Sequence, residues 1–571
     1  MGEGGSFVAK VKCPTCKRLS ADMPEASLAQ AKKELTSLRK LTVQSARLGE
    51  KIGQVIAQLR QVNAPADEPF IFTTVLADNE KLLRVVFGDC GDMEFRTFNA
   101  FGKRALLIYL GGMSDTVNLE TNIMKPLMTQ TSSINSQSKA QKSQVLPGNM
   151  QTIAETILGA VAVNVVGKAS VAIEAIMIGS ALLLIDGLAE GLSISAAHFV
   201  KRDISEADNE HVLRGPNESF NEVLIDNIVL LRRRTHDANV KVKILKIGDR
   251  SKASLALLYV ANLVKPGLLE EVERRLSVIH VDKILGMAGL EEFLIDHPWS
   301  PFPQTQTTER PDKVLAGLYE GRVAIILDGT PVASIVPCTY NISMQTSDDY
   351  NIQPVIASSI RLMRGIAAFV AVYLPAIYVA ITSYHPGMLP TPMAISVAEL
   401  RARSPFPSFM EAVIMEILLE VFQEAVVRLP KKIAGAASMI GALVIGTTIV
   451  QAGLINPLLV VVIATTALAS YSMPSYTFSM ALRWLRIPML VLSAILGLYG
   501  VILGLLVITV HLCSLRSFGE SYLGGMFNVD LLSDWKDSLL RVPAKLLKER
   551  PKEFGAQDQT RIGDRNGQSG S

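Results

Sequence analysis

The chain has 571 residues, of which 49% are apolar, and its 56 basic and 53 acidic residues give a net charge of +3. This near balance argues against nucleic acid as the main partner. Mean hydropathy is positive, as expected when a membrane region is averaged with ordinary globular sequence. The length leaves room for two or three soluble modules beside that region. The predicted fold class is α+β/α/β soluble N-terminal modules followed by an all-α polytopic membrane domain.

Residues 1–69 are predicted to form a helical extension. Cys13 and Cys16 make a CxxC pattern, but the sequence has no second pair at the spacing of a structural zinc site. A tail with two thiols is therefore favoured over a metal or redox site, and no cofactor is expected. The start has no apolar leader, so later helices must direct insertion, and the long N-terminal region is expected to stay cytoplasmic.

Two small α/β modules are predicted next, at residues 70–130 and 151–345, joined by a Ser/Gln-rich linker at 131–150. In the second, apolar runs flank Asp186-Gly187 and again Asp328-Gly329, which predicts two similar β-hairpins. Their likeness suggests neighbouring positions in one sheet.

No catalytic signature accompanies these modules. The sequence has no Walker, HExxH, GxSxG or kinase pattern, so the chain is not expected to be an enzyme. The run Arg232-Arg233-Arg234 ends a predicted helix, where it complements the helix dipole. Phosphate binding is the sharper alternative for these arginines.

The membrane domain is predicted at residues 357–512, because no Asp, Glu, Lys or Arg occurs from 433 to 482. A crossing takes about 20 apolar residues, and Arg361 and Arg364 mark the cytoplasmic end of the first span. Arg483 and Arg486 are taken to mark a second such end. Four to five helices are expected, at 362–383, 408–429, 433–451, 458–472 and 488–512. A C-terminal tail, 513–571, follows.

Within the second of these helices, Glu416, Glu420, Glu424 and Arg428 recur every fourth residue. They share one stripe, and carboxylates on it cannot favourably face lipid. Two readings remain. Either the glutamates form structural pairs, such as Glu424 with Arg428, or they line a hydrated cation path as pore-lining residues.

The next helix carries Gly441 and Gly446 among other small residues. Such spacing lets helices approach closely in lipid, so these two glycines are predicted to serve helix packing.

At this point the sequence resembles the A subunits of the GerA-type spore germination receptors, over roughly residues 80–525. The matching motifs lie in both parts of the chain: Arg214-Gly-Pro-Asn-Glu-Ser-Phe220, Leu231-Arg-Arg-Arg234, Pro301-Phe-Pro-Gln-Thr305, Arg310-Pro-Asp312, His385-Pro-Gly-Met-Leu-Pro-Thr-Pro392, Pro405-Phe-Pro407, Glu411 with the glutamate stripe, Arg428-Leu-Pro430, Gly441-Ala-Leu-Val-Ile-Gly446, Pro474-Ser475-Tyr476 and Ser514-Leu-Arg-Ser-Phe-Gly519.

The resemblance implies a multi-pass protein of the spore inner membrane that works with a transporter-like B subunit and a C-subunit lipoprotein. It further implies a homo-oligomeric ring that conducts cations when a nutrient is sensed. Ion conduction is the leading hypothesis, and a scaffold without a pore is the alternative. A secondary transporter fits less well because the region shows few spans and no inverted repeat. Oligomeric state separates the first two, and the ligand-binding residues are not identified.

Overall fold

The computed structural model describes residues 70–128, 150–156, 162–197, 214–402, 404–430, 444–524 and 540–562, with 210, 212, 433, 435, 441, 537 and 538. The predicted N-terminal extension, including Cys13 and Cys16, lies outside the described residues, as does all but the last residue of the predicted linker.

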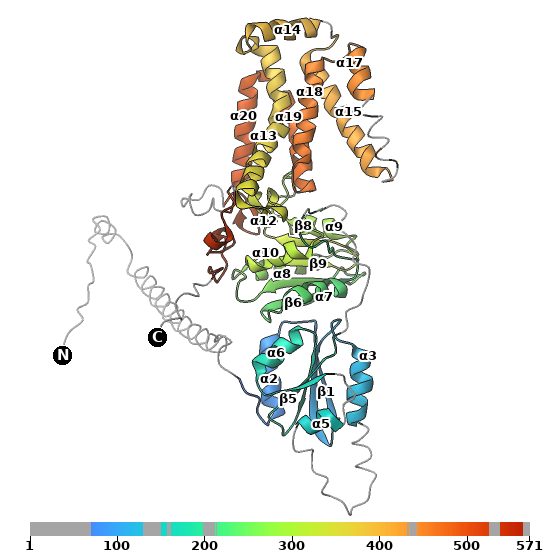
Figure 1. Ribbon diagram of the computed structural model, residues 1–571. Helices are drawn as coiled ribbons and strands as arrows, with labels where there is room; N and C mark the ends of the chain where they lie inside the picture. Colours follow the sequence, from blue (N-terminus) through green and yellow to red (C-terminus); the bar gives the residue numbers. More distant parts are fainter. Residues whose placement is uncertain are drawn as a thin grey trace, which may run out of the picture. The chain divides into compact units, whose positions relative to one another are not determined.

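The first module is an antiparallel sheet with helices on both faces (Figure 1). Its sheet order is β1-β2-β4-β5-β3. Every residue of β2 from Ala105 to Leu110 is buried, because alternate side chains point to opposite faces that are both covered. Leu106 packs under α2 and α6, whereas Leu107 packs under η2 and α5. In chain order the elements are α2 (Leu76–Phe87), β1 (Met93–Ala100), β2 (Lys103–Leu110), α3 (Thr116–Asn118), η2 (Leu119–Met124), α5 (Met150–Thr156), β3 (Val163–Val166), α6 (Ala169–Met177), β4 (Ala181–Ile185) and β5 (Gly191–Ile194).

The second module has the same plan, with sheet order β6-β7-β9-β10-β8. One apolar cluster joins the sheet to α7 and α10, and another joins it to α8 and α9. Its elements are α7 (Leu224–Arg234), β6 (Val240–Ile247), β7 (Ala253–Val260), α8 (Leu268–Ser277), α9 (Met287–Leu294), β8 (Gln306–Thr308), α10 (Pro311–Tyr319), β9 (Val323–Leu327) and β10 (Ala333–Val336).

The two modules repeat one another down to single hydrogen bonds. In each, the aspartate of the Asp-Gly pair accepts a hydrogen bond from the first backbone N–H of the module's first helix, at 3.1 Å in both cases. The glycine that follows has positive φ, 91° in Gly187 and 82° in Gly329, which glycine adopts without strain. An asparagine inside the same helix also bonds the chain six residues before it. The groups that repeat are Leu76 with Asp186 and Asn79 with Thr73 in the first module, and Leu224 with Asp328 and Asn227 with Asn221 in the second.

This arrangement corrects the sequence-based division of the soluble region. The Asp186 hairpin (β4 and β5) belongs to the first sheet, where Ala105 of β2 pairs with Ile185 of β4. The boundary expected at residue 151 therefore falls inside the first module. The two hairpins occupy equivalent places in separate sheets and are not neighbours in one sheet. Their likeness reflects repetition of the whole module.

The second module is followed by helices. Among the described residues, α13 and α19 are long and apolar enough to cross a membrane, and α18 and α20 are shorter apolar helices. α13 packs against α18, α19 and α20 (Figure 1). The bounds are α11 (Tyr340–Ser343), α12 (Asp348–Asn351), α13 (Pro354–Tyr384), η3 (Pro386–Met388), α14 (Thr391–Ala402), α15 (Ser408–Arg428), η4 (Val444–Thr448), α17 (Ile449–Gln451), α18 (Pro457–Tyr471), α19 (Tyr476–Leu496) and α20 (Leu498–Ser514), followed by β11 (Arg516–Ser517), β12 (Glu520–Ser521), η5 (Ala544–Leu546) and η6 (Lys552–Phe554).

The span expected at 488–512 is wrong in its bounds. Pro488 lies inside α19, and the chain reverses into α20 at Gly497, whose φ is 60°. The sequence pattern was misleading because Arg483 and Arg486 looked like a helix end. Both lie in the middle of α19, so neither marks the end of a span.

Candidate functional site

The three glutamates predicted to line a pore lie on α15, and the structure gives each a different environment. Glu416 is buried, whereas the side chains of Glu420 and Glu424 are 49% and 56% exposed. The shared stripe is therefore not uniform, and each carboxylate needs its own account.

Glu416 pairs with Arg486 of α19. Its Oε2 lies 3.1 Å from Nη1 of Arg486, whose side chain is 1% exposed. Nε of Arg486 also donates to the carbonyl oxygen of Ala371 in α13, at 2.6 Å. A buried guanidinium bonded in this way joins three helices, and removing its carboxylate partner leaves an uncompensated charge. Within a single chain, Glu416 therefore forms a structural ion pair, which is the first of the two alternatives for the glutamates.

Glu420 and Glu424 lie further along the helix toward Arg428. Glu424 pairs with Arg428 at 2.5 Å, and both side chains are more than half exposed. Glu420 lies 3.6 Å from Arg483 of α19, and Arg483 also donates to Gln423. Exposed apolar residues surround these carboxylates on α15, among them Ile417 and Val421. Charge and apolar surface are therefore mixed on the outer face of this helix.

Glu411, at the start of α15, is a buried carboxylate that the sequence analysis names only as a family motif residue and not as a candidate site residue. It is 1% exposed and accepts a hydrogen bond from the backbone N–H of Asn456, at 3.4 Å. Asn456 in turn caps α18 through Leu458. The available signal was its place in the first turn of an otherwise apolar helix, where a carboxylate faces protein or water.

The two glycines predicted to serve helix packing differ in this chain. A methyl group added at Gly441 would clash with the ring of Phe422 on α15, whereas nothing lies within 4 Å of a methyl group added at Gly446. Within one chain, the backbone at Gly441 thus lies close to the Phe422 side chain of α15. For Gly446 the packing role stays a prediction about contacts with other chains.

A buried charge cluster lies where the second module meets α13. Asp349, 1% exposed, accepts hydrogen bonds from Nε of Arg361 at 3.1 Å and from Nη2 of Arg364 at 2.6 Å. Burial alone would raise the pKa of Asp349, but its bonds to the two guanidinium groups hold that pKa below its usual value. Arg361 and Arg364 are therefore internal ion-pair partners, 4% and 8% exposed. That they mark the cytoplasmic end of the first span stays a prediction.

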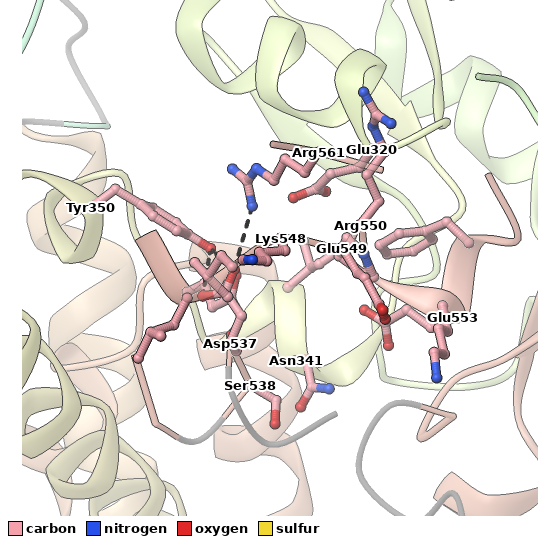
Figure 2. Close-up of a pocket in the computed structure, with 17 residues that line it drawn as sticks. Glu320, Asn341, Tyr350, Asp537, Ser538, Lys548, Glu549, Arg550, Glu553 and Arg561 are labelled. Carbon is pink, nitrogen blue, oxygen red and sulfur yellow. Dashed lines mark hydrogen bonds and ion pairs between the residues drawn. The ribbon is translucent and has the colours of Figure 1, made fainter. Parts of the chain in front are cut away.

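The C-terminal segment, residues 537–562, joins this cluster. Nη1 of Arg361 donates to the backbone oxygen of Asp537 at 2.6 Å, and Phe554 is buried against the end of the second module. Between segment and module lies a cavity of about 430 Å³, lined by Glu320, Tyr350, Arg550 and others (Figure 2). Burial raises the pKa of Glu320 to about 6.

The arginine run of α7 does not form a phosphate site at Arg232. This side chain is buried and pairs with Asp92 of the first module, with Nε 2.8 Å from Oδ2. Gly91 N–H also donates to the oxygen of Val242, at 2.8 Å. The buried arginine thus links the first module to the second, which sequence spacing alone does not show. Within the described residues, no group of three or more His, Cys, Asp or Glu side chains is placed to hold a metal.

The structure thus combines duplicated α/β modules with apolar helices that carry internal ion pairs, and two of these helices are long and apolar enough to cross a membrane. The chain belongs to the Bacillus/Clostridium GerA spore germination protein family, whose model matches residues 81–553. This confirms the resemblance found in the sequence.

Relatives of this family match nearly the whole chain. Spore germination protein B1 of Bacillus subtilis is 36% identical over 494 residues, covering 85% of this chain and 98% of that protein. Spore germination protein KA of Bacillus subtilis is 34% identical over 501 residues, covering 87% and 90%. Among solved structures, the N-terminal domain of the A subunit of the Bacillus megaterium spore germinant receptor GerK3 is 25% identical, with a TM-score of 0.37, and covers 48% of this chain and 98% of that one.

Proposed function

We propose that this chain is the channel-forming membrane subunit of a spore germinant receptor. It crosses the spore inner membrane several times, with its N-terminal modules on the core side, and several copies form a ring. Family membership and the names of its relatives support a role in germination. The ring works with a transporter-like B subunit and a lipoprotein C subunit, and the chain itself catalyses no reaction.

The observation that carries the conducting role is the outer face of α15. Glu420 is about half exposed there, beside Ile417 and Val421, which are 53% and 63% exposed. A carboxylate facing hydrocarbon costs about 3 kcal/mol or more, so this face needs water or another protein surface. A second copy of the chain supplies both, because a closed ring surrounds a hydrated path.

In such a ring, Glu420 and Glu424 form stacked circles of negative charge that attract cations and disfavour anions. Arg483 and Arg428 balance part of that charge in a single chain. Glu416 has a different role in this proposal, because its pairing with Arg486 holds α15 against α19.

The test is cation release from spores that carry Glu420→Gln or Glu424→Gln, with Glu399→Gln as the matched control. Glu399 is an exposed carboxylate on α14, outside the stripe. We expect slower release in the two stripe variants at normal protein level, and unchanged release in the control. Normal release in both stripe variants would refute conduction along this face.

The alternative function, a scaffold without a pore, makes a different prediction about assembly. A closed ring of the purified chain, seen by native mass measurement or cross-linking, supports a pore. A monomer or simple dimer supports the scaffold.

A further inference from the structure

The loop between α9 and β8 presents one large aromatic side chain to its surroundings. Trp299 is 98% exposed, the most exposed of the large apolar side chains among the described residues. Pro298 and Pro301 flank it closely and fix backbone φ on either side. A rigid loop that presents a tryptophan loses little conformational freedom when the ring is bound.

Two contacts place this loop at the ends of the apolar helices. Oγ of Ser300 lies 2.9 Å from Nε2 of His511, in the last turn of α20. The ring of Phe302 lies 6.1 Å, centroid to centroid, from the ring of Phe478, in the first turn of α19. Trp299 therefore lies beside the level at which both helices meet the soluble region.

If α19 and α20 cross the bilayer, that level is a membrane surface. The 17 residues of α20 rise about 26 Å, close to the ~30 Å of a hydrocarbon core. Exposed apolar side chains follow the helix from Tyr499 to Val510. Arg516, exposed, comes two residues after the helix ends. An apolar face that ends in a basic residue is the usual pattern at a bilayer surface.

We propose that Trp299 binds the lipid surface and holds the second module at a fixed height on the bilayer. Its indole lies in the headgroup layer, where a ring with an apolar body and one N–H donor is favoured. The inference rests on the proposed membrane placement of α19 and α20. It assigns the loop a lipid partner, because Ser300 and Phe302 hold the loop at the ends of the two apolar helices.

The test uses the full chain in vesicles of phosphatidylcholine and phosphatidylglycerol. Two single-tryptophan variants are compared, one retaining Trp299 and the other Trp484, with Trp535 replaced by Phe in both. Trp484 is 63% exposed on α19, about 12 Å along the helix from Tyr476. Part of the phosphatidylcholine carries bromine, either near the headgroup end of its chains or near their middle, and bromine quenches tryptophan emission on contact.

We expect Trp299 to lose more emission with the shallow bromines, and Trp484 to lose more with the deep ones. Quenching of Trp484 without quenching of Trp299 would overturn the lipid contact and leave the membrane placement intact; it would mean that protein or water surrounds the ring. Absence of quenching at both positions would overturn the membrane placement itself.

A second measurement covers the case in which Trp484→Phe fails to fold. Trp299→Cys is labelled with an environment-sensitive fluorophore in a chain whose Cys13, Cys16 and Cys513 are replaced by Ser. The protein is placed in detergent-free vesicles of the same lipids without bromine. The emission maximum of the label should then lie at a shorter wavelength than that of the free label in water. Emission like that of the free label in water would overturn the proposal.

Discussion

Separating the buried glutamate of α15 from the exposed ones gives the sharpest test of the site. Glu416→Gln keeps the shape of the side chain but removes the charge opposite Arg486. The pair is 3.1 Å apart, and its side chains are 9% and 1% exposed. Removing one partner of a buried pair costs about 3–5 kcal/mol. Glu424→Gln, by contrast, breaks an exposed pair of about 0–1 kcal/mol.

The assay is the thermal midpoint of the purified full chain in detergent, followed by loss of the monodisperse gel-filtration peak. For a domain of about 150–250 residues, each kcal/mol lost from the free energy of unfolding lowers the midpoint by about 2–4 °C. Glu416→Gln should therefore lower it by on the order of 10 °C, and Glu424→Gln by a few degrees at most. The double variant Glu416→Leu with Arg486→Met should recover much of the loss, because neither charge then remains buried.

Equal midpoints for Glu416→Gln and Glu424→Gln would refute this reasoning. They would mean that Glu416 is solvated in the assembled protein, as a pore-lining residue would be. Failure of the double variant to recover stability would show that Arg486 matters mainly through its bond to Ala371.

Three further outcomes are expected. Asp349→Asn removes the carboxylate that pairs with buried Arg364 and one of the two carboxylates that pair with Arg361, which keeps Asp537. It should cost about 3–5 kcal/mol in the same thermal assay, whereas an unchanged midpoint would contradict the buried cluster. Arg232→Met should lower the free energy of unfolding measured by chemical denaturation of the full chain, and Arg233→Met, at an exposed neighbour, should change that free energy by less than about 0.5 kcal/mol. The pKa of Glu320 is raised to about 6, so the protonated side chain stabilises the docked C-terminal segment at low pH, and this stabilisation is lost as pH rises through 6. Hydrogen exchange of residues 540–562 should therefore become faster as the pH rises. Glu320→Gln should remove that pH dependence.

Local features of the sequence were sufficient to predict that the chain contains buried strands and apolar helices. The buried β2 strand, the helical spacing of the glutamates and the charge-free stretch each depend on near neighbours. The duplicated Asp-Gly pairs were visible too, but their meaning was not. Asp186 bonds Leu76, 110 residues earlier in the chain, and a contact at that separation leaves no local pattern. The repeat therefore looked like two strands of one sheet.

Partners of the charged residues were beyond local reasoning for the same physical cause. The sequence predicts only that Arg361 and Arg486 mark cytoplasmic ends of spans, because it shows an arginine near apolar residues and not the carboxylate that the arginine meets. Glu416 lies 70 positions from Arg486. The sequence did offer an energetic clue. An apolar region that contains both basic and acidic side chains lowers its free energy when those side chains pair.

A series of hydrogen bonds and one ion pair connects the second module to α15. The C-terminal segment is fixed to the second module, where Gln557 N–H donates to Leu263 at 3.0 Å. It is also fixed to the start of α13, where Arg541 N–H donates to Ser358 at 2.9 Å. α13 accepts a hydrogen bond from Arg486, the partner of Glu416. In the proposed channel, a displacement of the second module is therefore expected to reach α15 through α13 and α19, because these contacts connect them.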